Sequence, residues 1–334
     1  MTFLAPRVFV LGNFVQACCW YVPRLPLPGE TLVATGLHIE PGGKGLNVAV
    51  CLQRLGLQAG TLIGCGNDAA GDQLLALLER EGISTQHVHR LAGASGCGSG
   101  WIGADGHNAI AVYPGANLLL TAAHARQAAA DIALAQLVYG QFETSVAAVE
   151  VAFAIAQAHG VPTVLNPSPW QPPSAALRGH THTIIVNETE ARALLALPAP
   201  LQGSVAQCAR SVHTQLPALW AAWPKLQQLV VTLGAQGCLA WSRPVGVNTA
   251  DGWHAPAHTI TAVDTVGAGD AFASGYCAAR VAGHSVPTAL QWGNACGACI
   301  ASSVGVLGAL PSAPVLQQWL ALADAPQVVS MAFL

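Results

Sequence analysis

The chain has 334 residues and a mass of 34.2 kDa, which is long enough for one large domain or two modest ones. Charged residues make up 9% of it and the net charge is -3, so we expect neither a basic nucleic-acid-binding surface nor a polybasic membrane-binding patch. Hydrophobic residues make up 52%, a content that excludes intrinsic disorder.

The high apolar content raises the question of a membrane span. The longest stretch without a charged residue, 281–323, is interrupted by proline, glutamine and asparagine, so it holds no run of about 20 apolar residues that could cross a bilayer. The first residues favour a strand over a secretory leader, and ten cysteines without a leader suggest reduced thiols. We therefore expect a cytoplasmic protein with no membrane and no nucleic-acid partner.

Strand-like and helical segments alternate along most of the chain. The expected strands are short apolar runs, most of them rich in β-branched residues, at 7–11, 61–63, 137–139, 163–165, 183–186 and 229–232. The expected helices have apolar residues at helical spacing and lie at 46–55, 71–81, 145–159, 188–195 and 205–222. This alternation is typical of a mostly parallel sheet with helices on both faces, so we predict an α/β/α fold in a single domain, 1–334.

Two segments break the alternation. Residues 31–39 alternate as a strand does, but no crossover helix follows them directly. Residues 98–113 are typical of a β-hairpin with its turn at 104–107. We expect these strands to form a small lid outside the main sheet, close to the glycine-rich segment that follows Glu40.

The first candidate motif is Pro-Gly-Gly-Lys-Gly-Leu-Asn-Val-Ala at 41–49. It is not a Walker A loop, because glycine follows Lys44 where that loop has serine or threonine. Its glycines let the backbone approach a ligand closely, and Lys44 and Asn47 add donors suited to hydroxyl groups. Taken alone, the motif is equally compatible with a plain glycine-rich turn.

The second candidate motif is Asp-Thr-Val-Gly-Ala-Gly-Asp-Ala-Phe at 264–272, between a β-prone segment at 258–263 and a helical one at 271–282. Gly267 and Gly269 would expose backbone N–H groups at a helix N-terminus, where an anion is favoured. Asp270 would lie beside that anion and could take a proton from an attacking hydroxyl. The alternative is a glycine-rich helix entry with the aspartate as a cap.

The two motifs, in this order and about 220 residues apart, resemble the N-terminal and C-terminal signatures of the ribokinase-like, or PfkB, carbohydrate kinases. Further segments similar to those of that family lie at 28–31, 113–117, 165–169, 187–190 and 231–237. The resemblance covers nearly the whole chain. It implies a three-layer ribokinase-like fold with a small β lid, and transfer of the γ-phosphoryl group of ATP to a hydroxyl of a small carbohydrate.

The resemblance also implies a role for each matching residue. Asp270 would be the general base, and the backbone of Gly267, Ala268, Gly269 and Asp270 would form the anion hole for the transferred group. The residues implied in acceptor binding are Gly42, Gly43, Lys44, Asn47, Glu143 and Asn166. The residues implied at the nucleotide are Asn187, Thr232, Gly234, Gly237 and Asn294.

Two cations follow from the same resemblance. Glu190, with Asn187, matches the family's Asn-x-x-Glu element, which organises Mg²⁺ largely through water. Asp264 belongs to a loop that often binds a monovalent cation such as K⁺. Backbone carbonyls supply most of the ligands of that cation, so the side chains in the sequence are a poor test of whether K⁺ binds.

One departure concerns the acceptor. Many sugar kinases of the family carry Asn-x-Asp after the first strand, where this chain has Val15 and Ala17. A shift of one or two residues would bring Asn13 or Gln16 to this place, but no carboxylate is available there to grip sugar hydroxyls. Trp20, Tyr21 or Trp101 would offer apolar surface instead. The hairpin has no lysine or arginine for a phosphorylated acceptor. A sugar, a sugar derivative and a nucleoside therefore stay open, as does a non-catalytic nucleotide-binding role.

The lid also bears on assembly. Lids of this family often pair across a dimer, and the apolar residues Trp101, Ile102, Ile110 and Val112 would suit such pairing. The alternative is that this hairpin only covers the bound substrate. We expect a homodimer through the lid.

Overall fold

A computed structural model describes residues 8–104, 107–244, 247 and 250–331. Its main sheet has ten strands in the order β14-β13-β12-β11-β10-β9-β8-β1-β4-β5. The strands are β1 (Val8–Leu11), β4 (Ala59–Gly66), β5 (Val88–Leu91), β8 (Leu137–Gln141), β9 (Thr163–Asn166), β10 (Thr183–Asn187), β11 (Gln228–Thr232), β12 (Cys238–Ser242), β13 (Asp251–Ala255) and β14 (Val329–Ser330). Every pair from β5 to β11 is parallel, and β12 to β14 extend the sheet in antiparallel fashion.

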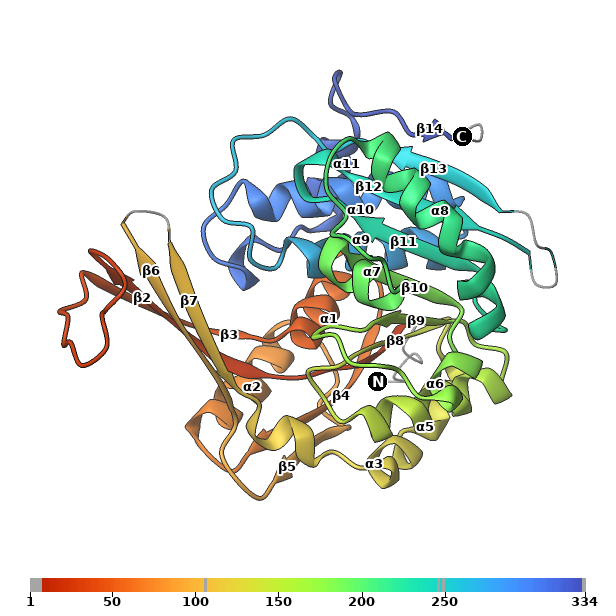
Figure 1. Cartoon of the computed structure of the whole chain (residues 1–334). Coiled ribbons are helices and arrows are strands. Elements are labelled where there is room, and N and C mark those ends of the chain that lie inside the picture. The colour runs from red at the N-terminus through yellow and green to blue at the C-terminus, as the bar shows by residue number, and fades with distance from the viewer. Residues whose placement is uncertain (1–7, 105–106, 245–246, 248–249, 332–334) are drawn as a thin grey trace.

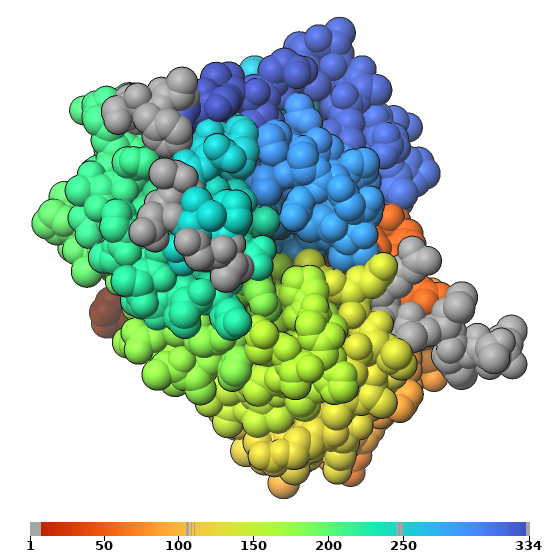
Figure 2. Space-filling model, turned by 90° about the vertical axis from the view of Figure 1, so that its right-hand side faces the viewer, coloured from red at the N-terminus to blue at the C-terminus, as the bar shows by residue number. Residues whose placement is uncertain are grey.

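Helices cover both faces of this sheet (Figure 1). They are α1 (Lys44–Arg54), α2 (Ala69–Arg80), α3 (Ala122–Gln127), α4 (Ala129–Leu134), α5 (Val146–Ala158), α6 (Ala175–Gly179), α7 (Glu188–Leu194), α8 (Val205–Ala222), α9 (Ala268–Val281), α10 (Val286–Ala301) and α11 (Ala313–Leu320). Single turns of 3₁₀ helix lie at η1 (Gly115–Leu119), η2 (Gly234–Gln236) and η3 (Leu307–Ala309). In Figure 2 the C-terminal residues gather at one end of the molecule and the yellow residues that follow the lid at the other.

The central strand β1 shows why three layers form. Val8 and Val10 pack into one apolar core, under α1, α9 and α10, whereas Phe9 and Leu11 pack into a second core, under α5 and α8. Successive side chains of a strand point to opposite faces, so an uninterrupted apolar run needs a helix layer on each side. The predicted three-layer α/β/α class is confirmed.

The lid is a separate sheet of four strands in the order β3-β2-β6-β7, which stands to one side of the main sheet (Figure 1). Its strands are β2 (Val15–Val22), β3 (Gly36–Gly42), β6 (Gly96–Gly103) and β7 (Asn108–Tyr113). The expected hairpin is there, although its turn residues 105–106 lie outside the described part. The expected strand at 31–39 begins later, at Gly36, and β2 was not expected at all.

The β-prone segment at 258–263 was interpreted wrongly, because it forms no strand. The strand nearest before the second motif is β13, which ends at Ala255, and its free edge pairs with β14. Segment 258–263 instead reaches the C-terminal end of α10, where Val263 N–H donates to the carbonyl of Ala301 (2.7 Å). Among the described residues, no helix is both long and apolar enough to cross a membrane.

Candidate active site

The second motif forms the N-terminus of α9, and a glycine is required there. Gly267 precedes the helix with φ of +79°, a conformation that residues with a Cβ rarely adopt. A Cβ at this position would lie 2.4 Å from Cγ1 of Val306, so side chains larger than hydrogen are excluded. A Cβ at Gly269 would meet no atom within 4 Å, so this side of the helix start is open.

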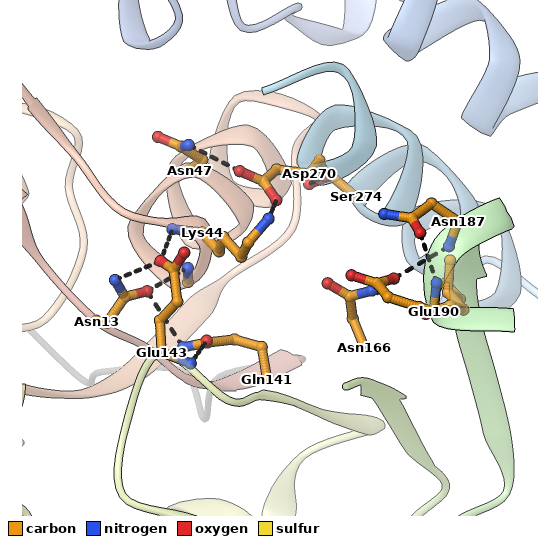
Figure 3. Close-up of polar contacts among 12 residues, drawn as sticks. Asn13, Lys44, Asn47, Gln141, Glu143, Asn166, Asn187, Glu190, Asp270 and Ser274 are labelled. Atoms are coloured by element: carbon orange, nitrogen blue, oxygen red, sulfur yellow. Dashed lines mark hydrogen bonds and ion pairs between the residues drawn. The ribbon is translucent and has the colours of Figure 1, made fainter. Parts of the chain in front are cut away.

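Asp270 occupies the first turn of α9 and is buried, with 6% of its surface exposed. Its Oδ2 accepts a hydrogen bond from Nδ2 of Asn47 (2.8 Å), and its Oδ1 lies 4.0 Å from Nζ of Lys44 (Figure 3). Burial raises the pKa of the Asp270 carboxyl, while the charge of Lys44 and the Asn47 amide act in the opposite direction. A buried carboxylate with a raised pKa is suited to accepting a proton.

Lys44 and Asn47 come from the start of α1, so the two motifs meet although they are far apart in sequence. The charge of Asp270 is the largest influence on Lys44 and raises the pKa of its ammonium group. Asn47 is itself buried, and its Oδ1 has no hydrogen-bond partner among the described residues. A buried acceptor without a partner is unusual and points to a missing donor at this place.

Glu143 lies on the other side of Lys44, after the end of β8. Its Oε2 accepts from Nδ2 of Asn13 (2.8 Å) and from the backbone N–H of Lys44 (3.3 Å). Oδ1 of Asn13 in turn accepts from the Gly45 N–H (2.9 Å) and from Nε2 of Gln141 (3.1 Å). Burial raises the pKa of Glu143, partly offset by the Lys44 charge. This network fixes the turn that begins α1.

The sequence analysis did not name Gln141, and it named Asn13 only as a residue that a shift of one or two positions would bring to the place of the missing Asn-x-Asp. Both stand at the carboxyl ends of neighbouring parallel strands, β1 and β8, which is where open α/β sheets place their ligand sites. Their position after expected strands was the available signal. Ser274 was also missed: its hydroxyl donates to the backbone carbonyl of Asp270 (2.7 Å) one turn into α9.

The glycines of the first motif have different reasons to be glycine. Gly43 has φ of +115° and Gly45 would place a Cβ 2.3 Å from Cα of Gly12, so both are needed to seat α1 against the end of β1. A Cβ at Gly42 would meet only ordinary contacts, the nearest at 3.5 Å from Ala17. Gly43 and Gly45 therefore allow α1 to approach the end of β1 closely, whereas Gly42 lies next to the lid strand β2.

Asn187 and Glu190 form a capping box at the start of α7. Oδ1 of Asn187 accepts from the Glu190 N–H (2.9 Å), and Oε2 of Glu190 accepts from the Asn187 N–H (3.0 Å). Within the described ranges no group of three or more His, Cys, Asp or Glu side chains could hold a metal ion. Mg²⁺ commonly binds through few carboxylates, with water and phosphates as its other ligands, so a site at Glu190 fits only in that form.

Asn166 ends β9, and its Nδ2 donates to the carbonyl of Ile185 (2.8 Å). In Figure 3 it lies beside Glu190 and away from the group formed by Lys44, Glu143 and Asp270. The structure thus brings Lys44, Asn47 and Glu143 together with Asp270, and places Asn166 with Asn187 and Glu190.

The remaining predicted nucleotide residues follow β11. Thr232 ends this strand, and the turn through Gly234 (φ +52°) and Gly237 (φ +88°) returns the chain into β12. A Cβ at Gly237 would lie 2.0 Å from the carbonyl oxygen of Ala255, so this residue has to be glycine.

Asn294 projects from α10 toward the same region. Its Nδ2 donates to the carbonyls of Ala255 and Pro256 (3.0 and 2.9 Å), which orients its amide oxygen. It lines a pocket of about 150 Å³ together with His258, Gln291 and Trp292. Polar and apolar side chains both line this pocket.

Asp264 stands at the start of the second motif, where its Oδ1 accepts from the Val266 N–H (2.9 Å). The backbone beside it is held by the Ala301 carbonyl, which accepts from Val263 N–H. The carboxylate thus shapes the loop that leads into α9.

Comparisons with known proteins show which proteins this chain is similar to. Residues 5–313 match the model of the pfkB family of carbohydrate kinases. A ribokinase of Haemophilus influenzae is 31% identical over 91% of this chain and 94% of its own length, and a deoxyribokinase of Salmonella typhimurium is 29% identical over 94% and 99%. Among solved structures, Arabidopsis thaliana ribokinase complexed with ribose and ATP superposes with a TM-score of 0.84 at 23% identity, covering 96% of this chain and all of that one.

Proposed function

The chain belongs to the pfkB family of carbohydrate kinases, which are phosphotransferases with an alcohol group as acceptor, and we propose that it transfers the γ-phosphoryl group of ATP to a hydroxyl of a small carbohydrate. The observation that carries the proposal is the buried Asp270 at the open N-terminus of α9, held by Asn47 and Lys44. A proton acceptor and an anion-binding helix end lie side by side there.

In the proposed reaction the acceptor oxygen attacks the γ-phosphorus in line. A bond forms between them, the bond to the oxygen that bridges the β- and γ-phosphorus breaks, and the hydroxyl proton passes to Asp270. The backbone N–H groups of Gly267, Ala268, Gly269 and Asp270 stabilise the charge on the transferred group. Lys44 adds a positive charge 4.0 Å from the Asp270 carboxylate.

The unpartnered Oδ1 of Asn47 supports placing the acceptor at this point. The bond that its Nδ2 gives to Asp270 fixes the amide orientation, so Oδ1 is an acceptor that needs a donor. A substrate hydroxyl would be such a donor. Gly42, Gly43, Lys44 and Glu143 would complete the acceptor side.

ATP would lie along Thr232, Gly234 and Gly237, with its base in the pocket beside Asn294. Mg²⁺ would supply positive charge that offsets the charge of the phosphates, and Glu190 would hold it through water. K⁺ at the loop of Asp264 is part of the same proposal. The ten cysteines are free thiols in the structure, which suits the reducing cytoplasm that we propose as its location.

The acceptor is proposed to be a neutral sugar. The names of the relatives, ribokinase and deoxyribokinase, favour this class. A nucleoside is the second candidate, because Val15 and Ala17 of β2 stand where many sugar kinases of the family carry Asn-x-Asp. A non-catalytic nucleotide-binding role has less support, since a purely binding site has no need of the buried Asp270.

Release of ADP from MgATP with K⁺ present, measured across free sugars, sugar derivatives and nucleosides, tests the proposal. We expect one acceptor class to stimulate ADP release, and Asp270→Asn to abolish the stimulation. If no acceptor of any class stimulates release although ATP binds, the proposed transfer reaction is wrong.

We also propose a homodimer through the outer face of the lid. Trp20 pairs with Trp101 and with Leu37 across neighbouring strands, so these side chains share one face. Leu37, Ile39 and Tyr113 on that face are 49%, 50% and 59% exposed. Exposed apolar side chains gathered on one face mark interaction surfaces. Light scattering that gives a mass near 34 kDa at micromolar concentration would contradict the dimer.

A further inference from the structure

A carboxylate on the lid reaches the C-terminal half of the chain. Glu40 lies in β3, two residues before the first motif's Gly42. Its Oε1 accepts a hydrogen bond from the backbone N–H of Val306, 266 positions away in sequence (3.1 Å). The Glu40 side chain is 16% exposed, and its Oε2 lies 3.6 Å from Nε2 of the more exposed His38. None of the motifs assigns a role to Glu40.

The strand register shows which face of the lid Glu40 occupies. Glu40 is opposite Ala17 on β2, and Ala17 is in turn next to Gly98 on β6, so the three share one face. This inner face is turned toward the segment around Val306, as the Glu40 hydrogen bond requires. Ala17 and Gly98 are too small to reach across, and a Cβ at Gly98 would meet only Val112, at 3.9 Å. Glu40 is long enough to do so.

The residue to which Glu40 is bonded, Val306, lies next to the start of α9, which forms the proposed anion hole. Val306 packs against Gly267, where even a single added Cβ would come within 2.4 Å of its Cγ1. The carboxylate, Val306 and the start of α9 thus form one continuous series of contacts. The contact between Glu40 and Val306 therefore connects the lid to the segment that packs against the proposed phosphoryl-binding backbone.

We propose that Glu40 is a positioning residue that fastens lid strand β3 to Val306 and so holds the lid over the reaction site. The proposal rests on the proposed kinase function. An acceptor that binds beneath the lid needs the closed position. Its apparent affinity is its affinity for the closed form multiplied by the fraction of molecules in which the lid is closed. Loss of the fastening therefore weakens acceptor binding while leaving ATP binding unchanged.

The chemistry of the contact distinguishes this role from direct contact with the acceptor. The partner of Glu40 is a neutral backbone N–H, and an amide oxygen can accept the same hydrogen bond. Glu40→Gln therefore keeps the fastening, whereas Glu40→Ala removes it. A Glu40 that bound two acceptor hydroxyls would lose much of its acceptor capacity in either variant.

The kinetic test compares these variants with Glu30→Ala as a matched control. Glu30 is another lid carboxylate, but its partner is Arg24, within the lid itself. For Glu40→Ala we expect the KM for the acceptor to rise about tenfold, which corresponds to the net contribution of one hydrogen bond. We expect kcat and the KM for ATP to stay within about threefold of wild type. Glu40→Gln and Glu30→Ala should stay within about threefold throughout. An unchanged acceptor KM in Glu40→Ala, or an equal loss in Glu40→Gln, would overturn the proposal.

Amide hydrogen exchange tests the same contact without using activity. In Glu40→Ala we expect the peptide that contains Val306 to exchange about tenfold faster, with no change in Glu40→Gln or Glu30→Ala. Equal exchange in all four proteins would show that Glu40 does not hold this segment. If the wild type phosphorylates no acceptor, the proposed function fails, but the exchange measurement still decides whether the fastening exists.

Discussion

The replacement Asp270→Asn tests the core of the proposed mechanism. Asparagine has nearly the same shape and can still accept the hydrogen bond from Nδ2 of Asn47, but it cannot take a proton from the acceptor. A positioned general base contributes about 10²- to 10⁴-fold to a rate, which corresponds to about 2.7–5.5 kcal/mol of transition-state stabilisation. We expect kcat to fall within that range.

The structure indicates that this loss will not come from unfolding. Burial of the Asp270 carboxylate is unfavourable and raises its pKa, whereas its attraction to Lys44, 4.0 Å away, is favourable. An attraction at this distance is about 4 kcal/mol at the effective dielectric of proteins, and the desolvation penalty of a buried ion is also several kcal/mol. Because the neutral amide loses both, the melting temperature should change by less than about 4 °C.

The assay is coupled ADP release with saturating acceptor, run beside calorimetric titration of ATP. Removing a negative charge near the phosphates should leave the Kd for ATP unchanged or lower it. Turnover within about fivefold of wild type would refute the assignment of Asp270 as the base. A melting temperature lowered by 10 °C or more would show that the desolvation cost of Asp270 and its attraction to Lys44 do not offset each other.

Three further predictions concern the same site and the lid. Lys44→Met removes the charge that opposes the raised pKa of Asp270, so the acid limb of the kcat/KM profile, along which activity falls as Asp270 becomes protonated, should move to higher pH; an unmoved limb would contradict the coupling. Gly267→Ala should lower kcat at least tenfold, because the Cβ clashes with Val306 at a positive φ, and full activity would show that this backbone is not needed. Trp101→Glu should give a monomer by light scattering, because a charge would enter the proposed outer-face interface; an unchanged dimer mass would place the interface elsewhere.

The fold could be predicted because its signals are local. The apolar run of β1, with side chains buried on both faces, indicates a central parallel strand without any knowledge of its neighbours. β2 escaped prediction because its sequence, Val-Gln-Ala-Cys-Cys-Trp-Tyr-Val, has little polar–apolar alternation. Segment 258–263 was interpreted as β-prone from its residues alone, but the sheet edge that it would need is taken by β14.

The proposed general base could be named from the sequence, because Gly267, Gly269 and Asp270 lie within one turn at the start of α9. The residues that contact this turn could be predicted only in part. Asn47 and Lys44 lie in a motif of their own, but their approach to Asp270 depends on α1 and α9 packing side by side.

The sequence by itself determined the layered fold, the family and the motif that holds the proposed base, since each can be recognised from short runs of residues and their order along the chain. Only the tertiary structure decided which distant groups meet: Asn13 with Glu143, 130 positions apart, and Glu40 with Val306, 266 apart. Such contacts depend on strand order and on the register of the lid, in which a shift of one residue would turn Glu40 to the other face. No local pattern in the chain encodes that register.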